Sequence, residues 1–116
     1  MSLLDKTDYE VLGIAELLLD YLVESSNDKD YLSSIMHVSK AMILAASEVE
    51  IGKQWTNIEM LTSLSNEREY FGCLRRNSHV TVLYKQTSNK VPGEFLGRLV
   101  LGVEDDEVKI FGATIF

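Results

Sequence analysis

The sequence predicts an α+β protein, with helices first and an antiparallel β-meander after them. Up to about residue 51, apolar residues recur every three or four positions, which is the spacing of one helix face. From His79 onward they alternate with polar residues, which is the spacing of a strand. No glycine- and serine-rich linker and no internal repeat divides the chain. We therefore expect a single domain over 1–116, helical over about 7–76 and β over about 79–116.

The first helix begins at "TDYE". Thr7 can accept a hydrogen bond from the backbone of Glu10, and the Glu10 side chain can reach back to Thr7, which makes a capping box. An apolar face at helical spacing follows and consists of Val11, Ile14, Ala15, Leu18 and Leu22. We expect this helix to run to about Glu24.

A second long helix is expected after the polar stretch "SSND". Asn27 or Asp28 can cap it, and Gly52 is well placed to stop it after Ile51. Its apolar seam has alternating steps and consists of Leu32, Ile35, Met42, Ala46 and Val49. Because the connection is short, the two long helices should pack antiparallel.

One or two short helices are expected next. In "WTNIEM", Thr56 and Glu59 form a second capping box, which predicts a helix over about 57–64. The stretch "SNEREYFGCLRRN" is ambiguous: Asn66 and Glu69 suggest another cap, whereas Gly72 and its aromatic neighbours weaken a helix. We favour a short helix to about residue 76, and a strand remains the open alternative.

About three strands complete the predicted fold. "HVTVLYKQ" places Val80, Val82 and Tyr84 on one face, "TSNKVPG" is a turn, and "EFLGRLVLGV" and "EVKIFGATIF" are two further strands. The four carboxylates between them, Glu104 to Glu107, lie where a hairpin must reverse. Neighbouring side chains there point in different directions and lack the alternate spacing of a calcium loop, so we predict a turn and no metal site.

Composition limits the classes of partner. The net charge is −7, and residues 1–60 hold eleven acids against four lysines, which disfavours nucleic acid and leaves open a protein partner with a basic surface. No apolar run is long enough to span a bilayer, and the first ten residues resemble no secretion signal. With a single cysteine, the chain fits a reducing compartment, so we expect a cytoplasmic protein without membrane contact. Two histidines and one cysteine fall short of a zinc pattern, and no glycine-rich loop leads into a helix, so we expect no metal and no cofactor.

The leading functional hypothesis is a protein-binding module that is not an enzyme. Glu16, Asp20 and Glu24 form an acidic row along the first helix and are the candidate partner-binding residues. The helices and strands are apolar on more than one side, and the chain ends on Ile115 and Phe116, which favours a homodimer or a higher oligomer. Antitoxins, immunity proteins and inhibitors carried by phages or other mobile elements share this profile as a class.

Two alternatives remain open. A small-molecule sensor would have a pocket between helices and sheet, for which the candidate lining residues are Trp55, Tyr70, Phe71, Tyr84 and Phe95. A cysteine-dependent enzyme would need Cys73 as nucleophile and His79 as base. No local signature around the cysteine supports this third hypothesis.

Overall fold

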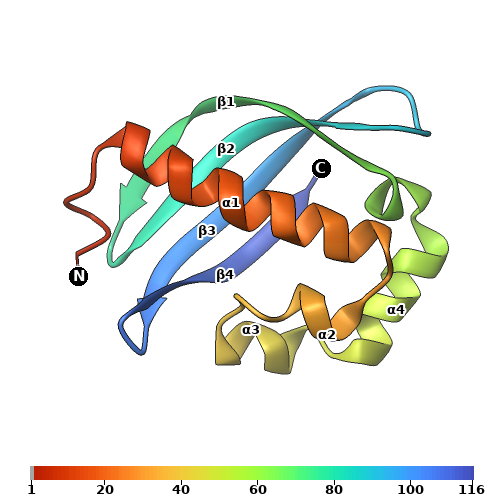
Figure 1. The fold of residues 1–116 in the computed structure, drawn as a ribbon, viewed down its shortest axis with the longest axis horizontal. Helices are drawn as coiled ribbons and strands as arrows, with labels where there is room; N and C mark the ends of the chain where they lie inside the picture. Colours follow the sequence, from red (N-terminus) through yellow and green to blue (C-terminus); the bar gives the residue numbers. More distant parts are fainter. Residues whose placement is uncertain (1) are drawn as a thin grey trace.

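The computed structural model describes residues 2–116 as a sheet with the longest helix across one of its faces and the shorter helices beside the edge of its last strand (Figure 1). The elements in chain order are α1 (Asp8–Asn27), α2 (Tyr31–Ser34), α3 (Lys40–Ala45), α4 (Glu48–Asn57), the 3-10 helix η1 (Glu59–Thr62), β1 (Leu64–Arg76), β2 (His79–Ser88), β3 (Glu94–Glu104) and β4 (Glu107–Ile115). The predicted α+β class, with helices preceding an antiparallel sheet, is confirmed. The sheet has four strands instead of about three, and the two longest helices are α1 and α4.

α1 crosses the sheet and begins where the sequence predicts. The Thr7 hydroxyl accepts from the Glu10 N–H at 3.2 Å, and the Glu10 carboxylate accepts from the Thr7 N–H at 3.0 Å, so both directions of the capping box are present. The residues that α1 buries against the sheet at a spacing of four are Val11, Ala15, Leu19 and Val23. Among residues 2–116, neither α1 nor any other helix is long and apolar enough to cross a membrane.

The second long helix, predicted over about 28–51, is wrong as a single element. The segment is divided among α2, α3 and the first part of α4. The side chains of Asp30, Ser39 and Ser47 each accept a hydrogen bond from the backbone N–H three residues later, and each therefore starts a new helix. The apolar seam read from the sequence thus belongs to three short helices that change direction.

α4 continues through the position where the sequence predicted a stop. Gly52 lies inside the helix, and the Thr56 hydroxyl donates to the Gly52 carbonyl at 2.9 Å. Because this hydroxyl has an acceptor one turn back, the predicted capping box of Thr56 with Glu59 does not form. The chain after α4 makes only the short η1, so the predicted helix over 57–64 is also wrong.

Residues 66–76, for which we favoured a helix, belong to β1. Two features explain why the strand was not predicted from the sequence. The pairing with β2 is shifted between Tyr70 and Gly72, where a bulge inserts Phe71 and Gly72 adopts a φ of +149° that favours glycine. The side chain of Arg68 is buried, although arginine usually marks a solvent position. The β part therefore begins at Leu64, and the predicted helical half over 7–76 is too long.

The sheet is an antiparallel meander with the strand order β1-β2-β3-β4. The acidic run forms the turn between β3 and β4, as predicted. Asp105 and Asp106 adopt φ values of 54° and 61°, and Glu104 pairs with Glu107 across them, as in a two-residue hairpin turn in which both central residues are left-handed.

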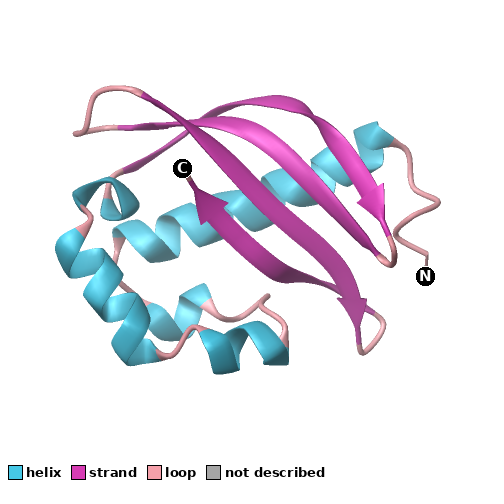
Figure 2. Ribbon diagram, turned by 180° about the vertical axis from the view of Figure 1, so that it is seen from behind, coloured by secondary structure: helices cyan, strands magenta, loops and turns pink. Residues whose placement is uncertain are grey.

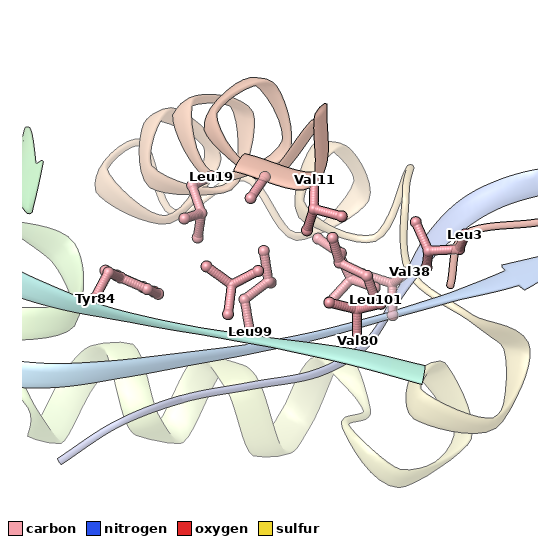
Figure 3. Close-up of a cluster of buried hydrophobic side chains, with 11 residues drawn as sticks. Leu3, Val11, Leu19, Val38, Val80, Tyr84, Leu99 and Leu101 are labelled. Atoms are coloured by element: carbon pink, nitrogen blue, oxygen red, sulfur yellow. The ribbon is translucent and has the colours of Figure 1, made fainter. Parts of the chain in front are cut away.

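The core lies between α1 and one face of the sheet. Figure 3 shows Val11 and Leu19 of α1 pointing toward Val80, Leu99 and Leu101 of the central strands. All five side chains are at most 1% exposed. Tyr84 extends this core toward the far end of the sheet.

Candidate functional site

The acidic row of α1 faces β1, and part of it is neutralised from within the chain. Arg68 Nη1 donates to Glu16 Oε1 at 2.9 Å and to Asp20 Oδ1 at 2.8 Å. The Tyr70 hydroxyl also donates to the Glu16 carboxylate. Within residues 2–116, the Glu24 carboxylate has no ion-pair partner. Two of the three candidate partner-binding residues are thus already engaged, and a role of the row in partner binding stays a prediction.

Arg68 is the buried member of this cluster. Its side chain is 1% exposed, whereas those of Glu16 and Asp20 are 42% and 49% exposed. Burial lowers the pKa of Arg68, but the hydrogen bond to Asp20, the contact with Tyr70 and the charge of Glu16 outweigh this effect and raise it overall. A buried cation that lost both carboxylates would be strongly destabilising. The cluster therefore stabilises the packing of α1 against β1.

A pocket lies between α1, α4 and the second half of β4. Its volume is about 430 Å³, within the range of ligand sites, and most of the side chains that line it are apolar. Of the five predicted aromatic lining residues, Trp55 and Tyr84 line this pocket and the other three do not. Among the described residues that line it, none carries a charged side chain.

The three remaining aromatic candidates lie elsewhere. Tyr70 is held against Glu16. Phe71 is the inserted residue of the β1 bulge and is 59% exposed. Phe95 lies in β3, where its ring is within van der Waals reach of the Gly93 position. The structure therefore does not bring the five aromatic residues together.

Gln86 is a pocket residue that the sequence analysis missed. It is completely buried, and its Nε2 donates to the carbonyls of Ser65 and Thr87, both at 2.8 Å. Its Oε1 has no hydrogen-bond partner among the described residues. Neighbouring Tyr84 is 3% exposed, and burial raises its pKa to about 12. The alternation of Val82, Tyr84 and Gln86 was the available signal, because it places the amide on the core face.

The carboxylates of the β3–β4 turn diverge. Asp105 pairs with Lys40 Nζ at 3.7 Å, and Glu104 accepts from the Lys40 backbone N–H at 3.3 Å. Glu107 pairs instead with Lys109 at 3.1 Å. In the described part of the chain, no three histidine, cysteine or acidic side chains are arranged to hold a metal ion.

Cys73 and His79 lie on opposite faces of the sheet. Cys73 pairs with Val82 and packs against the core, whereas His79 contacts the ring of Phe111 on the other face, with a centroid distance of 4.8 Å. Burial, and then the charge of Asp8, raise the pKa of the Cys73 thiol, so its thiolate fraction at neutral pH falls. The nucleophile–base pair that the cysteine-dependent alternative would need does not form in this structure.

The second face of the sheet has no helix on it. Figure 2 shows this face toward the viewer, with α1 behind the strands. Strand pairing and alternation place on it the apolar side chains Leu74, Leu83, Leu96, Val100 and Phe111, which we call the open-face cluster. Leu74 is 60% exposed and Leu96 is 42% exposed. An uncovered sheet face that carries several apolar side chains is typical of a binding surface.

Comparison with protein-family models, curated proteins and solved structures found no match for this chain.

Proposed function

We propose that the protein is a binding module that acts as a homo-oligomer, in its simplest form a symmetric dimer joined through the open face of the sheet. The observation that carries the proposal is the open-face cluster, since none of its members belongs to the core cluster that α1 covers. Packing two such faces together would bury the cluster of both copies and produce a helix–sheet–sheet–helix arrangement.

The charges on this face favour a second copy over a strongly basic partner. Lys85 lies between Glu69 at 3.2 Å and Glu94 at 3.0 Å, and Arg98 is exposed on the neighbouring strand. Both signs of charge are thus present around the apolar cluster. A surface with both signs can complement itself across a two-fold axis, whereas a basic partner would be attracted more strongly to the acidic side of α1.

The size of the face fits a small dimer interface. Four strands about 4.8 Å apart, each contributing roughly eight residues at about 3.3 Å, span about 500 Å². Two copies would therefore bury roughly 1,000 Å², which is the lower limit for a specific interface. We expect a reversible dimer.

Light scattering coupled to size exclusion tests this proposal over a range of micromolar concentrations. We expect the wild-type mass to approach twice the chain mass of 13.1 kDa. Val100→Arg places a charge at the centre of the open face and should give a monomer. Leu17→Arg is the matched control, because Leu17 is 74% exposed on the outer side of α1, and it should leave the dimer intact.

Two results would contradict the proposal. One is a wild-type monomer at the highest concentration reached. The other is a Val100→Arg protein that remains dimeric, because the interface would then lie on another surface. Circular dichroism spectra of both variants should match the wild type, since neither substitution touches the core between α1 and the sheet.

A further inference from the structure

The outer edge of β4 is unpaired along its second half. Phe116 and Leu96 exchange two backbone hydrogen bonds, N to O at 2.9 Å and 3.3 Å. Because inward- and outward-pointing groups alternate along an antiparallel strand, Thr114 also bonds toward β3, and the N–H and C=O groups of Ala113 and Ile115 point away from the sheet. No other segment of residues 2–116 pairs with these outward groups.

The chain itself occupies the other end of this edge. Ile110 N–H donates to the His37 carbonyl at 2.7 Å, and Ser39 N–H donates to the Ile110 carbonyl at 2.8 Å, which forms a short parallel bridge. Ser39 then caps α3, and the chain leaves the sheet. The position of a fifth strand is thus filled beside Ile110 and free beside Ala113 and Ile115.

The pocket runs along this free edge. Residues 113–116 all line it, although the side chains of consecutive strand residues point to opposite faces, so the pocket must follow the strand's edge. Leu22 of α1 and Trp55 of α4 form part of its other wall. At about 3.3 Å per residue, a three-residue extended segment is about 10 Å long, which matches the free edge.

The chemistry of the pocket favours an uncharged apolar peptide over an ionic ligand or a small apolar molecule. Its lining carries no charged side chain among the described residues, so an ionic ligand would lose its hydration without gaining an opposite charge. Two outward N–H and C=O pairs, two residues apart, match the repeat of a peptide backbone, and the apolar wall matches its side chains. A small apolar molecule would leave these backbone groups unpaired.

We propose that this edge and pocket bind an extended, uncharged apolar segment of another protein, which adds to the sheet as a fifth strand beside β4. The site is separate from the open face of the sheet and does not depend on the dimer proposed above. The backbone of the segment would pair with Ala113 and Ile115, while its apolar side chains would enter the pocket beside Gln86.

Fluorescence anisotropy with a synthetic peptide library tests the inference. Each peptide has three central positions that vary over the apolar residues, and serine and glycine residues flank these positions. Each peptide also has a counterpart in which the central backbone amides are N-methylated. We expect a subset to bind and their N-methylated counterparts to bind at least tenfold more weakly. Ile115→Pro removes the outward N–H while leaving those of Thr114 and Phe116 in place, and it should weaken binding about tenfold. Ile115→Val keeps the N–H and should bind within about twofold of the wild type.

Each opposing result would overturn the inference. Equal binding of peptides and their N-methylated counterparts, or no binding by any library member, would exclude strand addition. If neutral phenylnaphthylamine fills the pocket and no peptide displaces it, the pocket is a small-molecule site. If Ile115→Pro instead abolishes the dimer in light scattering, the edge pairs with a second copy. A Val100→Arg protein that remains dimeric contradicts only the proposed function, because Val100 does not line the pocket.

Discussion

The two faces of the sheet are built from the same strands but differ in how far their apolar side chains are exposed to solvent. On the face toward α1, Val82 and Leu99 are completely buried, whereas on the other face Leu74 and Leu96 are 60% and 42% exposed. Apolar character alone therefore does not decide which residues form the core. The face that α1 covers forms the core, whereas no helix of residues 2–116 covers the second face (Figure 2).

The same contrast holds for the arginines. Arg68 lies on the covered side with its side chain 1% exposed, and two carboxylates compensate its charge. Arg98 lies on the open face and is exposed. The charge on the covered side thus needs internal partners, whereas the charged group on the open face is in contact with water.

The largest expected effect compares one leucine from each face. Leu99→Ala should lower the free energy of unfolding by about 3 kcal/mol, because it leaves a cavity beneath α1. Leu83→Ala on the open face should cost about 1 kcal/mol or less. Urea denaturation in the Val100→Arg background, where no dimer contact contributes, measures both. Equal losses would mean that another part of the chain covers the open face.

The next effect concerns the buried cation. The double variant Glu16→Gln with Asp20→Asn leaves Arg68 buried without a compensating charge, and we expect a loss of about 3 kcal/mol in the free energy of unfolding. Asp8→Asn is the control, because the Arg75–Asp8 pair is more exposed and should contribute less than about 1 kcal/mol. A double variant as stable as this control would show that the cluster does not stabilise the packing of α1 against β1.

The smallest effect is a pH dependence on the covered side. Burial raises the pKa of Tyr84 to about 12, above the value of about 10 in the unfolded chain. The neutral phenol is therefore favoured by folding, and its contribution is complete below pH of about 10 and is lost as the pH rises toward 12. The unfolding free energy should fall more steeply over this window in the wild type than in Tyr84→Phe, by roughly 2 kcal/mol. Tyr9→Phe, at a ring that is 88% exposed, should follow the wild type, and parallel curves for all three proteins would contradict the burial argument.

The sequence predicts the elements whose signals are local. The capping box of Thr7 and Glu10 and the alternation of Val80, Val82 and Tyr84 each form as expected, because their patterns lie within a few consecutive residues. The long helix over 28–51 fails because its seam is compatible with several short helices, although caps such as Ser39 were visible in the sequence.

β1 and the sites were harder to predict because they depend on distant residues. A buried Arg68 looks like a solvent position until Glu16 and Asp20 are placed beside it. Trp55 of α4 and Tyr84 of β2 line the same pocket, and the spacing of these residues in the sequence does not predict it. The open face could be anticipated only as an excess of apolar residues without a location.

A mixed sample of isotope-labelled and unlabelled protein tests most directly whether the open face joins two copies. Filtered nuclear Overhauser spectra of this sample report only contacts between different molecules. We expect such contacts from the methyl groups of Leu74, Leu83 and Val100. Contacts only from helix methyls such as those of Leu17, or none at all at a concentration where the dimer should form, would contradict the account.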